Sequence, residues 1–157
     1  MRTRLALAAI GLASLLAGAA HAATPPPNDA DLVFAGNIPE RTYYFADAHL
    51  NRAGDSVEFW AFGAERTNMV VEGKTIAGAW MLTRIDCKAK TFSSIELVAL
   101  LPDLSVAFRA PMDPKVPQIV ADSSMDRVRL FICEGQTPTA DDRLPDISAA
   151  IKANKPK

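Results

Sequence analysis

Few residues of this chain could carry out chemistry. It contains two histidines, His21 and His49, and two cysteines, Cys87 and Cys133. A histidine acts as the general base of a hydrolase only with a nucleophile and an orienting group beside it. His49 has Asp47 as its only titratable close neighbour in the sequence, and we interpret it as a surface histidine. We therefore predict no catalytic residue and keep a hydrolase only as a third hypothesis.

The two cysteines lack the surroundings of a metal or redox site. Neither lies in a Cys-x-x-Cys motif or beside a histidine, and zinc and redox sites need such ligands close by. In an oxidising compartment a lone pair of cysteines is most simply a structural disulfide. A bridge between Cys87 and Cys133 would close a loop of about 47 residues and stabilise the fold by roughly 4 kcal/mol. We predict this bridge, and no metal or cofactor.

Carboxylates are the remaining source of chemistry. Asp86 and Glu96 could approach each other across a hairpin, where two carboxylates can act as acid and base. Asp141, Asp142 and Asp146 could loosely attract a cation, but they lack the ligand spacing and the glycine of a calcium loop. We interpret both groups as solvated charges.

The first 22 residues have the pattern of an export signal. Arg2 and Arg4 precede an apolar run over residues 5–16, which is too short to span a bilayer. Small residues at Ala20 and Ala22 predict cleavage after Ala22. No cysteine lies near this position, so we expect neither a lipid anchor nor stable membrane insertion. The expected location is the periplasm or the medium.

Removal of Arg2 and Arg4 changes the formal net charge from -1 to -3. A chain of this charge has no basic footprint, so nucleic acid is not an expected partner. The remaining length suits one domain. We predict a signal peptide at residues 1–22, a proline-rich spacer at 23–30, a single domain at 31–133 and a disordered tail at 134–157, which is polar and contains three prolines. The alternative for the tail is one or two weak amphipathic turns through Leu144, Ile147 and Ile151.

Alternating apolar residues predict a sheet. The expected strands cover residues 31–35, 41–46, 56–62, 80–87, 91–101 and 105–109. Turn-forming residues lie at 36–39, 51–55 and 88–90, and residues 63–78 are expected to form a mobile connection that could include a short edge strand at Val70 and Val71. We therefore predict an α+β fold, in which an antiparallel β-sheet of about 5–6 strands packs with a C-terminal α-helix and carries one disulfide.

The helix is expected over residues 123–133. Met125, Val128 and Ile132 fall on one face at helical spacing, and Ser123 can cap the first turn. A strand over residues 127–133 remains an alternative, because Val128, Leu130 and Ile132 also alternate.

Residues 56–62 provide the candidate binding surface. Glu58, Trp60 and Phe62 share one face of this strand, so aromatic rings would stand beside a charge. The alternative is that the rings are covered by the helix or a loop, as aromatic side chains usually are.

Several short motifs occur in a characteristic order. They are Tyr43-Tyr44-Phe45 before Asp47, Arg52-Ala53-Gly54 leading into Val57-Glu58-Phe59-Trp60, then Ile85-Asp86-Cys87 and Phe131-Ile132-Cys133. This set resembles the surface-adhesin protein E-like family of small exported proteins from Gram-negative bacteria. The resemblance implies an antiparallel sheet, a late helix and a disulfide from the central strand to the last structured segment. It also implies binding of other proteins, whereas this chain lacks the acylation cysteine of a surface-anchored adhesin.

Our leading hypothesis is therefore an exported, non-enzymatic binding module, adhesin-like, with a protein partner from the envelope or from a host. The alternative is a periplasmic protein that binds a small molecule or an envelope component. That alternative requires an apolar pocket with a few polar groups, and a pocket beneath the helix would favour it. The oligomeric state is left open.

Overall fold

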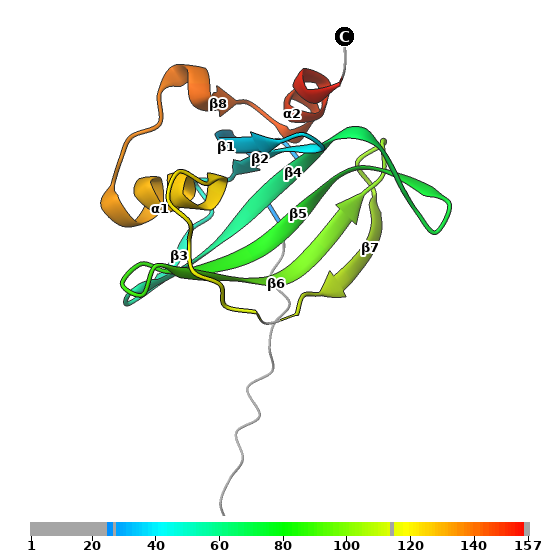
Figure 1. Cartoon of the computed structure of the whole chain (residues 1–157). Coiled ribbons are helices and arrows are strands. Elements are labelled where there is room, and N and C mark those ends of the chain that lie inside the picture. Colours follow the sequence, from blue (N-terminus) through cyan, green and yellow to red (C-terminus); the bar gives the residue numbers. More distant parts are fainter. Residues whose placement is uncertain (1–24, 27, 114, 156–157) are drawn as a thin grey trace, which may run out of the picture.

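The computed structural model describes residues 25–26, 28–113 and 115–155 (Figure 1). The expected signal peptide lies outside the described residues. The strands are β1 (Leu32–Ile38), β2 (Arg41–Phe45), β3 (Asn51–Ala53), β4 (Ser56–Val71), β5 (Lys74–Asp86), β6 (Thr91–Leu100), β7 (Val106–Pro111) and β8 (Arg143–Leu144). The helices are α1 (Ser124–Glu134), the 3-10 turn η1 (Ala140–Asp142) and α2 (Ile147–Asn154). None of the described helices is long and apolar enough to cross a membrane.

The described strands form one antiparallel sheet of eight strands in the order β7-β6-β5-β4-β2-β1-β8, with β3 paired to β4. The α+β fold is confirmed, but the sheet has more strands than predicted. The short strands β3 and β8 account for the difference, because two or three residues are too few to show an alternating pattern.

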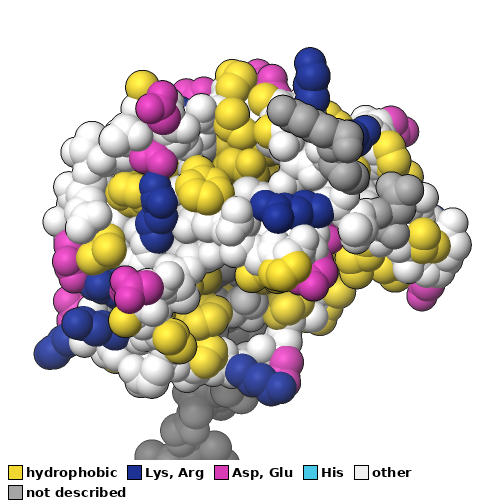
Figure 2. Space-filling model, turned by 45° about the horizontal axis from the view of Figure 1, so that its top comes forward, with side chains coloured by type: hydrophobic (Ala, Val, Ile, Leu, Met, Phe, Trp, Pro, Cys, Tyr) yellow, Lys and Arg dark blue, Asp and Glu magenta, His cyan; other side chains and the backbone are white. Residues whose placement is uncertain are grey.

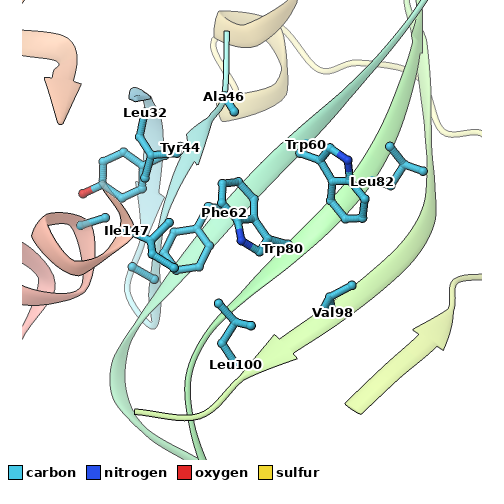
Figure 3. Packing of buried hydrophobic residues seen from close by; sticks show 12 residues of the cluster. Leu32, Tyr44, Ala46, Trp60, Phe62, Trp80, Leu82, Val98, Leu100 and Ile147 are labelled. Atoms are coloured by element: carbon cyan, nitrogen blue, oxygen red, sulfur yellow. The ribbon is translucent and has the colours of Figure 1, made fainter. Parts of the chain in front are cut away.

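Both faces of the sheet are apolar, so both need a cover. In β4, Val57, Phe59 and Ala61 belong to the core beneath α1. Trp60 and Phe62 belong to a second core on the opposite face, which α2 helps to cover through Ile147 (Figure 3). The sheet therefore lies between two helices that come from separate parts of the C-terminal third.

The α1 helix confirms the helical interpretation of residues 123–133 over the strand alternative. Its N-cap is Ser123, whose side chain accepts a hydrogen bond from Asp126 N, and Gly135 ends it in the left-handed conformation, at φ 71°. Cys133 in its last turn is bonded to Cys87, which follows β5, with a Cα–Cα distance of 5.6 Å. The predicted disulfide is confirmed, and it fastens the end of α1 to the sheet.

The prediction of a disordered tail at residues 134–157 is wrong for the described part. Ile147 and Ala150 are fully buried against the sheet. Asp146 caps α2 by accepting a hydrogen bond from Ala149 N, and Asn154 at its end donates to Ala64 O. The alternative of a weak amphipathic segment through Ile147 and Ile151 is closer to the structure. The stability of this short helix comes from packing rather than from local propensity.

The segment before β1 also packs on the domain, which corrects its interpretation as a spacer. Pro26 and Ala30 are buried, and Asn28 O accepts a hydrogen bond from Ile147 N at 3.2 Å. The two ends of the described chain are therefore joined by a backbone hydrogen bond. Prolines that lack a donor can still fill an apolar surface, and composition alone does not reveal this.

Residues 63–78 are not the mobile connection that we expected. They form the outer halves of β4 and β5, where Met69 pairs with Ile76 beyond an irregularity that begins after Ala64. The predicted turn at residues 36–39 is also displaced, since Gly36 and Asn37 lie within β1 at a bulge. Glycine in a strand often marks such a bulge, and the prediction overlooked this use.

The disulfide should contribute strongly to stability. Replacing both Cys87 and Cys133 by serine is expected to lower the free energy of unfolding by about 4 kcal/mol, because the unfolded chain gains the entropy of an open loop. Denaturant titration of residues 23–157 measures this change, and adding a reductant to the double variant serves as the control. An unchanged midpoint would contradict the role given to the bridge.

The packing of α2 gives a second prediction. Ile147→Ala should cost about 2–5 kcal/mol, because it leaves a cavity in a fully buried site. Lys152→Ala on the exposed side of the same helix is the matched control, and should change the free energy of unfolding by less than about 0.5 kcal/mol. Equal effects of the two variants would show that α2 does not pack as described.

Candidate functional site

The predicted aromatic surface is not exposed. Trp60 is 4% exposed and Phe62 is 0% exposed, and the ring of Phe62 packs against Trp80 with centroids 5.0 Å apart (Figure 3). Glu58 is instead ion-paired with Arg84 of β5 at 2.5 Å. The interpretation of Glu58, Trp60 and Phe62 as one binding surface is therefore wrong, because the rings are core residues of the α2 side.

The other residues singled out for chemistry are also separated. His49 is exposed, and Asp47 is ion-paired with Arg143 at 2.8 Å. Glu96 contacts Arg109 at 2.9 Å and lies opposite Leu82, well along the strands from Asp86. No group of three or more His, Cys, Asp or Glu side chains in the described part of the chain could hold a metal ion.

The described residues form a groove of about 710 Å³ beneath α1, which we call the α1 groove. Its floor is the sheet, with Tyr43, Phe59, Ala61, Met81 and Phe92 from strands β2, β4, β5 and β6. Its wall is α1 and the preceding loop, with Val120, Met125 and Val128. Residues 35–38 of β1 line it as well. The groove therefore runs across strands β1, β2, β4, β5 and β6 beneath the single helix α1.

The loop before α1 is held by a cluster around Asp126. Its carboxylate accepts from Asp122 N at 3.1 Å and from Arg129 Nε at 2.8 Å. Arg129 is buried and also bonds Glu134. The hydrogen bond from Arg129 lowers the pKa of Asp126, and the bond from Asp122 N acts in the same direction. These bonds fix the wall of the groove at the start of the helix.

A close contact with β1 sets the height of α1 above the sheet. Gly36 has φ 154°, and a Cβ atom there would come within 2.3 Å of Ser124 Oγ. Only glycine allows the helix to approach the strand this closely. At the far end of α1, Arg52 donates a hydrogen bond to Ile132 O, so the helix is fixed at both ends.

Arg127 closes one side of the groove. Its guanidinium carbon lies 5.1 Å from the ring centroid of Phe34 and 5.6 Å from that of Phe131. The same guanidinium contacts Asp142 at 2.6 Å. The guanidinium of Arg127 is therefore already paired with groups of the same chain.

The mouth of the groove carries exposed apolar side chains. Val120 is 70% exposed and Ile38 is 42% exposed, and both line the groove. Gln118, Asp122 and Ser123 add a few polar groups. On the face shown in Figure 2, Lys and Arg side chains are interspersed with Asp and Glu, so that face shows no large field of one sign. The arrangement suits an apolar ligand rather than a polyanion.

The sequence contained only a weak signal for this groove. Val116 and Val120 lie in a proline-rich segment, where isolated apolar residues need no explanation. The groove depends on the distance between α1 and the sheet, which no local pattern encodes.

Comparison with solved structures finds a match in overall architecture. Haemophilus influenzae protein E superposes with a TM-score of 0.50 over 71% of this chain and 92% of its own, at 13% sequence identity. This chain shares its fold with protein E. The selenomethionine form of protein E gives a TM-score of 0.49 at 13% identity, covering 71% of this chain and 93% of that one. No family model and no curated protein sequence matches the chain.

The fold of protein E confirms, at the level of architecture, the resemblance stated from the ordered motifs. At 13% identity the likeness concerns the course of the backbone. The role of the α1 groove must therefore be argued from the residues of this chain.

The Asp126 cluster gives a pH-dependent prediction. Because the pKa of Asp126 is lowered in the folded chain, its carboxylate stabilises the fold above about pH 4, the ordinary value for aspartic acid, and this contribution is lost as the pH falls through the lowered pKa. Asp126→Asn should therefore be less stable than the parent at neutral pH, and the difference should shrink in acid. Urea titrations of both proteins over this range measure it. A difference that does not change with pH would contradict the prediction.

Proposed function

We propose that this chain is an exported, non-enzymatic binding module that holds a protein partner through the α1 groove. The observation that carries the proposal is a groove of about 710 Å³ whose floor is apolar and whose mouth exposes Val120 and Ile38. Exposed apolar side chains beside a concave apolar surface are typical of binding sites.

Export is supported by the disulfide and by the first residues of the chain. The Cys87–Cys133 bridge suits an oxidising compartment. The pattern of residues 1–22 is that of a signal peptide cleaved after Ala22. The proposed location is the periplasm or the medium, and the proposed partner is an envelope or host protein.

A non-enzymatic role agrees with the lining of the groove. The lining contains no histidine, cysteine or lysine, and its acidic side chain Asp122 lies at the exposed edge. Its other titratable side chains are the ion-paired Arg127 and the phenols Tyr43 and Tyr44, with no histidine or carboxylate beside them in the lining to activate them. General acid–base catalysis needs a titratable group held against the substrate. The groove instead offers apolar contact area.

A small apolar molecule or envelope component is the second candidate, and the groove beneath α1 is the kind of pocket that we expected to favour it. The volume of the α1 groove falls within the range of roughly 300–1,000 Å³ found for small-ligand sites. Gln118 and Ser123 could orient the polar end of such a molecule. This candidate uses the same groove, so a single pair of variants tests both.

Val120→Glu and Val116→Glu form that pair. Both valines are exposed, at 70% and 63%, and lie in the same segment, but only Val120 lines the groove. Placing a charge at the mouth should lower the affinity for an apolar partner at least about tenfold, whereas Val116→Glu should bind as the parent does.

The measurement is retention of proteins from envelope extracts and of purified host matrix proteins on immobilised residues 23–157, parent and variants side by side. Binding of the apolar dye 1-anilinonaphthalene-8-sulfonate to the same three proteins tests the small-molecule candidate. Loss of a ligand only in Val120→Glu supports the groove. Equal binding by all three proteins would remove the groove from the proposal.

A further inference from the structure

The outer edge of β1 is only partly paired. β8 consists of Arg143 and Leu144, which pair with Val33 and Leu32 and with no other residue of β1. β1 continues through residues 34–38, and no other described strand pairs with it on that side. An open edge presents backbone N–H and C=O groups in the arrangement that a further strand requires.

The bulge in β1 limits this open edge. The pairing with β2 shifts between Phe34 and Gly36, while residues 36–38 pair with β2 in regular register. Arg127 stacks on Phe34 just before the bulge. The free and regular part of the edge is therefore residues 36–38, which suits a short added strand.

The opposite edge of the sheet is better protected. β7 contains Arg109 and ends in Pro111, which has no N–H to offer. Lys74 Nζ also donates to Ala107 O of this strand, at 3.5 Å. Residues 36–38 of β1 contain neither a charged side chain nor a proline, the usual devices that block pairing.

The open edge and the α1 groove are continuous. Gly36, Asn37 and Ile38 all line the groove. Side chains of a strand alternate between faces, so every second residue of a strand added here would point to the groove side. One apolar side chain could then enter the groove while the backbone pairs with β1.

We infer that the ligand of the α1 groove is an extended peptide segment, which adds as a strand to residues 36–38 of β1 and places an apolar side chain beneath α1. The inference rests on the proposed function and names the class of ligand for the same site. Backbone hydrogen bonds supply affinity that is independent of sequence, and the groove selects the side chain.

Charge at the mouth adds a preference. Of the two charged side chains that line the groove, Arg127 is ion-paired with Asp142. The carboxylate of Asp122 is exposed and has no cation against it in the described structure. A segment with a basic residue near its apolar residue is therefore the best fit.

The test uses linear random peptides displayed on phage and selected on residues 23–157. Selected peptides are synthesised with a single N-methyl group at each position in turn. In an added strand, successive N–H groups point alternately toward and away from β1. We expect methylation at alternate positions to weaken binding at least tenfold, and methylation at the intervening positions to have little effect.

Amide hydrogen exchange locates the contact. Exchange at residues 36–38 should slow in the complex, because their outward backbone groups become bonded. Slowing at residues 106–111 instead would place the peptide on β7 and overturn the inference. Val116→Glu should bind the peptides normally and Val120→Glu should not.

The outcomes separate this inference from the proposed function. If binding fails in Val120→Glu but tolerates N-methylation at every position, the groove binds and the added strand is refuted. If Val120→Glu binds the peptides as the parent does, the peptides do not use the groove and the inference fails. If selection on the parent protein enriches no peptide beyond those enriched on Val120→Glu, the inference that the ligand is an extended peptide is refuted. The dye and the protein partners still test the groove in that case.

Discussion

The structure depends on one constraint, which is that the central strands β4 and β5 are apolar on both faces. Phe59 and Ile85 lie in the core on one side, while Trp60 and Trp80 lie in the core on the other. A sheet of this kind needs two covers, and the chain provides them after the last long strand. An eleven-residue helix such as α1 is about 16 Å long and 10 Å wide. The strands β7, β6, β5, β4, β2 and β1 lie side by side in that order, and six adjacent strands span roughly 24 Å. The helix α1 therefore leaves part of this face of the sheet open, and the open part is the groove.

The position of α1 is determined by contacts at its two ends. The disulfide of Cys133 and the hydrogen bond from Arg52 hold its last turn, whereas its first turn depends on the approach of Ser124 to Gly36 and on the Asp126 cluster. Neither cysteine lines the groove, whereas Ser124 and Met125 at the end held by polar contacts form part of its wall. The site is therefore built where the helix is fastened by weaker interactions.

Features encoded by neighbouring residues could be predicted from the sequence. Ser123 and Gly135 delimit α1, and the lysines and alanine of residues 88–90 form the turn between β5 and β6. The disulfide joins distant residues, but it could be predicted because the chain has only two cysteines. Features that depend on distant contacts could not. Ile147 is a weak helical signal until the sheet buries it, and Trp60 gives the same alternating pattern whether its face is open or covered. The groove belongs to this second class, since Val120 and Tyr43 meet only through the tertiary fold.

The positions of the tryptophans determine which face of the sheet intrinsic fluorescence reports on. Trp60 and Trp80, which are all the tryptophans of the chain, lie in the core that α2 helps to cover, whereas Tyr43 lies on the floor of the α1 groove. Tryptophan emission therefore reports on the α2 side of the sheet and is a poor indicator of occupancy beneath α1. Tyr44 belongs to the same core as the tryptophans, so tyrosine absorbance would mix the two faces. A tryptophan introduced on the groove side would follow the other half, and the two faces of one sheet could then be observed separately.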